Sequence, residues 1–275
     1  MRLSRLILLI SLISCASSKK VEDPSAKKAE IYYNHGTQAL MTQEYSKALK
    51  NLLQANSLKS NDSRIHNNLG MAYFFKNKLS PAIRHLKLSV SYDPKNTEAR
   101  LNLATVYMHA KKYNESQMQF DIVLNDLTFE GQFKTYFNLG ILSLRMNDQL
   151  KAINYFKQSL DESSSYCPAN YQLGNIYFKR GQFEKALQNY QAASKGTCYD
   201  SPGPHYKQAI SYMELKKYDF AQDKLKEILE RFSNKGSYQA LANKKLKELR
   251  KLKSLEARIE DKNIIQDRNI LTPDF

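Results

Sequence analysis

Residues 63–96 read SRIHNNLGMAYFFKNKLSPAIRHLKLSVSYDPKN, and this stretch predicts a pair of short helices. The residues that set its pattern stand at positions 7, 8, 11, 20, 24 and 32 of a 34-residue unit: Leu69, Gly70, Tyr73, Ala82, Leu86 and Pro94. Small residues at positions 8 and 20 let the two helices approach closely, and large residues fill the space between them. Since one such pair cannot bury its own apolar face, it needs neighbouring pairs.

The unit resembles the tetratricopeptide repeat (TPR), and its pattern recurs along the chain. Position 8 recurs as Gly36, Gly70, Ala104, Gly140, Gly174 and Ala209. Position 20 recurs as Ala48, Ala82, Ser116, Ala152, Ala186 and Ala221, and position 24 as Leu52, Leu86, Phe120, Phe156, Tyr190 and Leu225. Chance helical periodicity would not keep this phase, so the sequence predicts an all-α TPR solenoid of about six repeats over residues 29–235.

After the last repeat, Gly236 interrupts the pattern, and residues 236–261 predict a basic helix that caps the solenoid. Its apolar stripe is formed by Leu241, Leu246, Leu249, Leu252, Leu255 and Ile259. Its remaining surface carries Lys244, Lys245, Lys247, Arg250, Lys251 and Lys253. A terminal element of a solenoid needs such a polar outer face. Residues 262–275 form a tail for which the sequence indicates no fold.

The chain begins MRLSRLILLISLISC, which has the features of a bacterial lipoprotein signal peptide. A basic start is followed by an apolar stretch, residues 6–13, that is too short to span a bilayer as a mature helix. The last four residues, Leu-Ile-Ser-Cys, resemble a lipobox, in which a small residue precedes an acylated cysteine. We therefore expect residues 1–14 to be removed as a signal peptide and Cys15 to carry lipid such as palmitate. A plain secretory signal or the start of a buried helix is the alternative.

Residues 15–28 continue as a polar tether, whose Ser, Lys and Pro24 give it little reason to fold. By resemblance to bacterial lipoproteins, Ala16 instead of aspartate after the lipidated cysteine favours transfer to an outer membrane, although this sorting rule depends on the lineage. The expected location is therefore the cell outer membrane, with the lipid-anchored chain facing the periplasm.

The composition is that of an ordinary folded protein with a basic balance. Hydrophobic residues make up 42% and charged residues 25%, and the formal net charge is +15. Such a charge usually indicates nucleic acid or an anionic surface as partner. Export disfavours nucleic acid, which leaves anionic lipid headgroups, cell-wall polymers or an acidic protein. The alternative is a set of solvated lysine faces without a specific anion.

No residue pattern of an enzyme is present. The chain contains no G-x-S-x-G, no H-E-x-x-H and no P-loop. No two of the five histidines share a metal-binding spacing on one helix: His35, His66, His85, His109 and His205. We interpret each as a packing or surface residue. The sequence therefore predicts a non-enzymatic protein with no metal and no cofactor.

The predicted binding surface is the concave face, which the first helix of each TPR lines with positions 2, 5, 9, 12 and 13. The candidate groove residues at these positions are Tyr33, Leu40, Met71, Phe74, Leu101, Met108, Phe137, Ile141, Leu144, Tyr171, Phe178, Tyr206 and Met213. Large apolar patches mark binding sites, and this row fits an amphipathic helix or an extended apolar peptide of a protein partner. The alternative is that superhelical packing buries much of position 12. Chaperone-type TPRs clamp a carboxylate with Lys and Asn; here Asn67 and Asn175 are present without the paired lysines.

Apart from Cys15, the chain contains two cysteines, Cys167 and Cys198, which stand at positions 1 and 32 of the fifth repeat. Because the two helices of a repeat run antiparallel, the start of one lies beside the end of the other. An exported protein can oxidise such a pair, so the sequence predicts a disulfide, with two unpaired thiols as the alternative.

Together, the lipobox, the six TPRs, the size and the pair of Cys167 and Cys198 resemble the TPR pilotin lipoproteins of type IV pilus biogenesis, the PilF, PilW and Tgl type. The resemblance covers nearly the whole mature chain and leaves out the basic helix and tail after Gly236. It implies a scaffold or pilotin that helps to place and assemble a secretin pore in the outer membrane. The implied partner in the groove is a secretin-like outer-membrane protein.

Two other non-enzymatic functions fit a TPR lipoprotein, because the repeat itself hosts many partners. One is an adaptor that brings cell-wall hydrolases or proteases to the membrane. The other is a component of an outer-membrane protein insertion machine.

Overall fold

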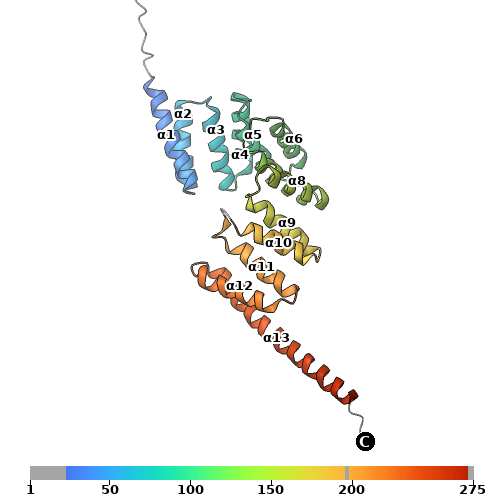
Figure 1. The fold of residues 1–275 in the computed structure, drawn as a ribbon. Helices are drawn as coiled ribbons and strands as arrows, with labels where there is room; N and C mark the ends of the chain where they lie inside the picture. Colours follow the sequence, from blue (N-terminus) through green and yellow to red (C-terminus); the bar gives the residue numbers. More distant parts are fainter. Residues whose placement is uncertain (1–22, 196–197, 272–275) are drawn as a thin grey trace, which may run out of the picture. The chain divides into compact units, whose positions relative to one another are not determined.

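The computed structural model describes residues 23–195 and 198–271, and this part of the chain contains helices and no β-strand (Figure 1). The chain divides into two compact units, with the boundary between Tyr92 and Asp93. This boundary falls at the end of α4 (Leu79–Tyr92), the last helix of the second predicted repeat.

The N-terminal unit consists of two helical hairpins. Its helices are α1 (Pro24–Met41), α2 (Tyr45–Leu58), α3 (Ser63–Phe75) and α4 (Leu79–Tyr92). Helix α1 packs against α2, α3 packs against α4, and α2 joins the two hairpins by packing against α3. The buried core between them is formed by Ala39, Ala48, Leu52, Ala55, Ile65, Leu69 and Ala72.

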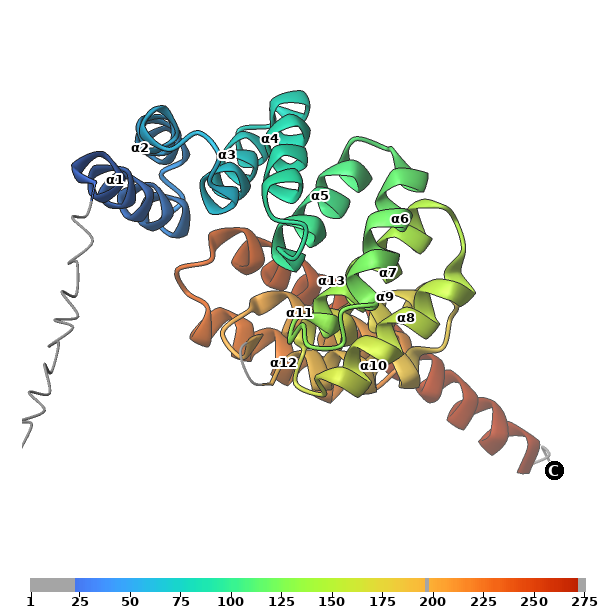
Figure 2. The same ribbon diagram turned by 90° about the horizontal axis from the view of Figure 1, so that it is seen from above.

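The C-terminal unit contains four further hairpins and one long helix. The hairpin helices are α5 (Thr97–His109), α6 (Tyr113–Leu124), α7 (Gln132–Arg145), α8 (Gln149–Glu162), α9 (Cys167–Lys179), α10 (Phe183–Ala193), α11 (Pro202–Glu214) and α12 (Tyr218–Arg231). Each hairpin packs against the next through α6 and α7, α8 and α9, and α10 and α11. The long helix α13 (Gly236–Leu271) packs against α12 and α11, and Figure 2 shows the three in one group.

All six predicted repeats form the expected hairpin, and their turns share one backbone feature. One residue with φ between 55° and 70° stands at position 15 of each repeat: Gln43, Asn77, Lys111, Asn147, Gly181 and Lys216. The next amide then donates back to a carbonyl near the end of the first helix, as Glu44 does to Ala39 at 2.8 Å. This bond satisfies a carbonyl that the helix end would leave without a partner. The repeat phase predicted from the sequence is therefore confirmed.

Close contact between the two helices of a repeat occurs where the sequence places small and large residues. A Cβ atom on Gly70 would lie 2.5 Å from Cγ of Leu86, and one on Gly140 would lie 2.5 Å from Cε1 of Phe156. Both large side chains are fully buried. A Cβ atom does not fit at these distances, so glycine at position 8 permits the observed spacing of the helices.

Two of the predicted boundaries are wrong. Helix α1 begins at Pro24, five residues before the predicted start of the array, because the Asp23 side chain accepts the amide of Ser25 at 3.0 Å and proline suits the first helical position. Helix α13 continues to Leu271, past the predicted end at residue 261. No proline or glycine interrupts the sequence before Pro273, so nothing local ends the helix earlier.

The apolar stripe predicted for the capping helix is only partly used. Leu249 is buried against the core formed by α11 and α12, and Leu246 and Leu252 pack beside it. By contrast, Leu255 and Ile259 are more than half exposed, and Leu241 is 41% exposed. The first half of α13 therefore caps the C-terminal unit, and its contact with the core ends near Leu252.

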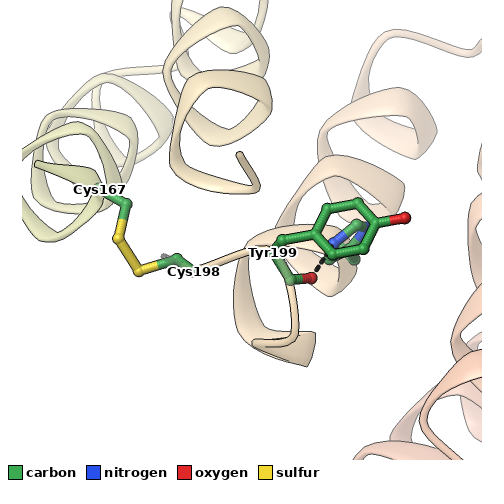
Figure 3. The surroundings of a disulfide bond; sticks show 4 residues. Cys167, Cys198 and Tyr199 are labelled. Carbon is green, nitrogen blue, oxygen red and sulfur yellow. Dashed lines mark hydrogen bonds between the residues drawn. A yellow bond between two sulfur atoms is a disulfide. The ribbon is translucent and has the colours of Figure 1, made fainter. Parts of the chain in front are cut away.

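A disulfide joins Cys167 at the start of α9 to Cys198, which follows α10 (Figure 3). Their Cα atoms lie 6.1 Å apart, within the usual range for a disulfide. The bond closes the fifth repeat, as the antiparallel arrangement of its two helices predicts.

We expect Gly70→Ala to lower the free energy of unfolding by about 1–3 kcal/mol, because the added methyl group overpacks the contact with Leu86. Gly236→Ala is the matched control, since a Cβ atom there has no neighbour within 4 Å. Urea denaturation of both variants measures the difference. Equal stability of the two would show that helix spacing does not depend on position 8.

We expect peptide mapping under non-reducing conditions to find Cys167 linked to Cys198 in protein purified without reducing agent. The chain between them contains about 30 residues, so replacing both cysteines with serine should cost about 3–4 kcal/mol of stability in the chain-entropy model. Mass spectrometry that finds two free thiols would contradict the disulfide.

Candidate binding groove

The N-terminal unit presents four of the predicted groove residues, and all four are half-buried: Tyr33, Leu40, Met71 and Phe74. The guanidinium carbon of Arg64 lies 4.8 Å from the centroid of the Tyr33 ring. The Phe74 ring lies 5.5 Å from that of Phe75, which is itself 47% exposed. These residues therefore combine packing within the unit with some surface that a partner can reach.

Six predicted groove residues of the C-terminal unit are also half-buried: Phe137, Ile141, Leu144, Tyr171, Phe178 and Tyr206. Phe137 packs against Phe156 and against Tyr166, with ring centroids 5.6 and 5.4 Å apart. Phe178 meets Phe183 edge to face at 5.2 Å. Aromatic side chains held in this way form a rigid apolar surface.

Three predicted groove residues belong to the core instead, and the prediction is wrong for them. Leu101 and Met108 are 4% and 2% exposed, because they pack with Phe120 and its neighbours between adjacent hairpins. Met213 is 8% exposed in the core that includes Leu249 of α13. Superhelical packing therefore buries part of the row at positions 5 and 12.

Helix α13 also covers the predicted groove residues of the sixth repeat, Tyr206 and Met213. The ring of Tyr238, near the start of α13, meets that of Tyr206 at 6.0 Å. Burial raises the pKa of the Tyr206 hydroxyl. Within the C-terminal unit, the half-buried groove residues that α13 leaves uncovered thus lie on α7 and α9.

A small pocket of about 290 Å³ lies beside the disulfide. Tyr171 and Tyr238 line it, and the hydroxyls of both point towards Gly203, where a Cβ atom would lie 3.7 and 3.1 Å from them. Burial, together with the neighbouring Tyr238, raises the pKa of Tyr171. The pocket extends the apolar surface of α9 towards α13.

Polar contacts hold the segment that follows the disulfide. Arg231 donates to the carbonyl oxygen of Tyr199 at 2.6 Å, and its guanidinium carbon lies 3.4 Å from the centroid of the Tyr199 ring. His205, which is 3% exposed, lies 3.1 Å from Glu227. Burial lowers the pKa of His205, and the Glu227 carboxylate opposes this shift. The segment from Cys198 onwards is thereby fixed to α11 and α12.

The sequence analysis missed a buried pair of histidines in the second repeat. Nδ1 of His66 lies 2.9 Å from Nδ1 of His85, and Nε2 of His66 lies 2.8 Å from the carbonyl oxygen of Ser60. A carbonyl only accepts, so His66 carries its proton on Nε2 and accepts from His85. Burial, with the charge of His66 as the next cause, lowers the pKa of His85 to about 4. Their places on the facing helices of one repeat are the signal that could have revealed the pair.

The geometry of His66 and His85 is that of a hydrogen bond and does not fit a metal site. A zinc ion between the two nitrogens would need about 2.0–2.1 Å to each, which a separation of 2.9 Å leaves no room for in a tetrahedral site. Elsewhere in residues 23–195 and 198–271, no group of three or more His, Cys, Asp or Glu is placed to hold a metal ion.

The helices of this described part are too short or too polar to cross a membrane. Cys15 and the predicted signal peptide lie outside it.

Family models for the tetratricopeptide repeat match four stretches of the chain: residues 63–96, 133–166, 167–195 and 205–235. These correspond to the second, fourth, fifth and sixth repeats. The first and third repeats form the same hairpin in the structure.

Two curated relatives match the chain over different shares of their own length. The type IV pilus assembly protein PilF of Pseudomonas aeruginosa is 19% identical over 197 residues, which are 69% of this chain and 77% of PilF. Mouse tetratricopeptide repeat protein 21B is 25% identical over 164 residues, but the match spans only 12% of that protein.

Two solved structures have a similar fold. That of Pseudomonas aeruginosa PilF has a TM-score of 0.64 at 16% identity, and the match covers 81% of this chain and 100% of PilF. That of PilW has a TM-score of 0.66 at 17% identity, with coverage of 78% and 97%. At these identities the likeness shows the fold. The repeat matches and the six hairpins lead to the same conclusion: the chain contains tetratricopeptide repeats and has a fold like that of PilF and PilW.

Proposed function

We propose that this protein is an outer-membrane lipoprotein that acts as a non-enzymatic scaffold, or pilotin, for assembly of a type IV pilus secretin. The observation that carries the proposal is the match to PilF, a type IV pilus assembly protein, over 77% of the length of PilF. PilW, the second structural relative, is described as a widely conserved type IV pilus biogenesis factor. Repeats and relatives of this kind favour a protein partner.

The half-buried groove residues are the proposed contact surface. In the N-terminal unit, Phe74 and Met71 lie on the first helix of the second repeat. In the C-terminal unit, Phe137 and Leu144 lie on α7 and Phe178 lies on α9. Apolar side chains that are packed on one side and open on the other bind a partner at little entropic cost, because they are already ordered. An apolar segment of the secretin is the proposed occupant.

The lipid anchor on Cys15 would hold this scaffold at the membrane where the secretin assembles. Helix α1 begins only nine residues after Cys15, at Pro24. The repeats would therefore stay close to the membrane surface.

Replacing Phe74 with glutamate tests the groove. We expect Phe74→Glu to abolish capture of the secretin in crosslinked pull-downs from membranes, because it places a charge on the apolar contact. Truncated anchors of this kind typically cost more than about 2 kcal/mol of binding free energy. Since Phe74 is half-buried, we expect the melting temperature to fall by only a few degrees.

Leu127→Glu is the matched control, because Leu127 is 91% exposed in the connection between α6 and α7. It makes the same kind of change away from the groove and should leave secretin capture intact. Loss of capture together with a large drop in melting temperature would mean that Phe74 is a core residue. Unchanged capture by Phe74→Glu would contradict a role for the groove of the N-terminal unit.

Replacing Cys15 with serine tests the anchor. We expect Cys15→Ser to abolish incorporation of a labelled fatty acid and to release the protein from the membrane fraction. The helices should remain folded, because Cys15 precedes α1. Equal labelling of the wild-type and variant proteins would contradict lipidation at this residue.

A further inference from the structure

The side of α13 that faces away from α11 and α12 carries a row of basic side chains. Its members are exposed and stand three, four and seven residues apart, a spacing that places them along one face of a helix. This basic row consists of Lys244, Lys247, Lys251 and Arg258. Within the part of the chain that the structure describes, no acidic side chain pairs with any of them.

The acidic residues nearby do not neutralise the basic row. Residues 241–259 contain seven Lys and Arg residues but only two acidic ones, Glu248 and Glu256. Glu248 contacts Lys245 at 2.8 Å, and Glu256 is half-buried. Lys253 pairs with Asp219 of α12 at 2.5 Å. The ion pairs therefore engage lysines outside the row, and the row keeps its positive charge towards solvent.

Two aliphatic side chains are exposed next to the basic row. Leu255 and Ile259 are 55% and 51% exposed. Leu255 stands four residues after Lys251 and three before Arg258, so it lies beside both on the helix surface. The second half of α13 extends beyond α12 (Figure 1), and its packing on the core ends near Leu252. A helix segment without tertiary contacts is marginally stable in water, so covering its aliphatic side chains would stabilise it.

We propose that this face of α13 binds the surface of an anionic lipid bilayer. The basic row lies on the headgroup phosphates, and Leu255 and Ile259 insert at the boundary of the acyl chains. A helix with basic side chains beside an apolar strip lies in the plane of the membrane interface in this way. Lys and Arg reach the phosphates while their methylene groups stay beside the apolar residues. The positive row also matches the negative potential of such a surface.

A bilayer fits this face better than a nucleic acid or a second copy of the chain. The phosphate backbone of a nucleic acid would engage the basic row but would leave Leu255 and Ile259 uncovered. A symmetric dimer through the same face would bring the two basic rows together, which is unfavourable. An anionic interface compensates the charge and covers the aliphatic side chains at once.

The proposed contact lies outside the groove, does not depend on the secretin, and adds to the lipid on Cys15. A short basic amphipathic face binds reversibly, and stable attachment needs a second signal such as an acyl chain. Salt weakens the contact further, because it screens exposed charges. Release of the Cys15→Ser protein from salt-washed membranes is therefore expected with this contact in place.

Sedimentation with lipid vesicles tests the inference. The protein is residues 15–275 with Cys15→Ser, which keeps every helix that the structure describes and lacks the acyl chain and the apolar stretch of residues 6–13. We expect binding to vesicles with about 30% phosphatidylglycerol in phosphatidylcholine, and about tenfold weaker binding or less to pure phosphatidylcholine. Raising NaCl from about 50 to about 500 mM should weaken binding to the anionic vesicles by about tenfold or more.

Charge-removing variants then locate the contact. The row variant combines Lys247→Gln, Lys251→Gln and Arg258→Gln, which keep good helix formers in α13. The matched control removes the same charge from exposed lysines of other helices by Lys87→Gln, Lys151→Gln and Lys157→Gln. We expect the row variant to bind anionic vesicles about tenfold or more weakly, and the control to stay within about twofold of the unchanged protein.

Insertion of the apolar part has its own readout. The chain contains no tryptophan, so Ser254→Trp places a single reporter between Lys251 and Arg258. We expect its emission to shift to shorter wavelength with anionic vesicles and to stay unchanged with neutral ones. Leu255→Gln together with Ile259→Gln should weaken vesicle binding by about tenfold, with little change in melting temperature because both side chains are more than half exposed.

Four outcomes would overturn the inference: no vesicle binding, equal binding to neutral and anionic vesicles, equal losses in the row variant and its control, or a dimer in sedimentation velocity that Leu255→Gln with Ile259→Gln dissociates. The first would leave an acidic protein as the occupant of the face, and the last would assign the face to a second copy of the chain. Intact vesicle binding without capture of a secretin would instead overturn the proposed function and keep this contact.

Discussion

The arrangement of every repeat depends on one contact, between position 8 of its first helix and position 24 of its second. Where glycine occupies position 8, as in Gly70 and Gly140, the partner side chain lies against the helix backbone itself. In the third repeat, Ala104 stands at this position, and the Ser116 hydroxyl donates to its carbonyl at 2.8 Å. The close approach orders one helix against the other, so that within each unit successive hairpins can pack against one another and leave their first helices on one face.

Some groove residues on the first helices are buried and others stay partly exposed, depending on which helix packs next to them. In the third repeat, Leu101 and Met108 belong to the core because Leu139 and Leu142 of the next hairpin are buried in the same cluster. After the sixth repeat, α13 packs where a neighbouring hairpin would pack, and it covers Tyr206 and Met213. Between these two covered regions, α7 and α9 keep Phe137, Leu144 and Phe178 partly open. The groove of the C-terminal unit is thus limited at one end by its own terminal helix.

Polar side chains that are buried or partly buried make contacts with the backbone and with one another. Some stabilise the fold, as Arg231 does when it binds the backbone of Tyr199 next to the disulfide. The buried pair of His66 and His85 belongs here too, since the hydrogen bond between their Nδ1 atoms joins the two helices of the second repeat.

The sequence by itself determined the repeats, their phase and the pairing of Cys167 with Cys198, because these features depend on contacts within one hairpin. A regular spacing of small and large residues is enough to specify such contacts. Only the tertiary structure decided which groove residues stay open and that α13 covers the last repeat. Those outcomes depend on how one hairpin is placed on the next. Residues at the same repeat position can face solvent in one repeat and lie under a neighbouring helix in another. The repeat pattern therefore does not predict which of them are exposed.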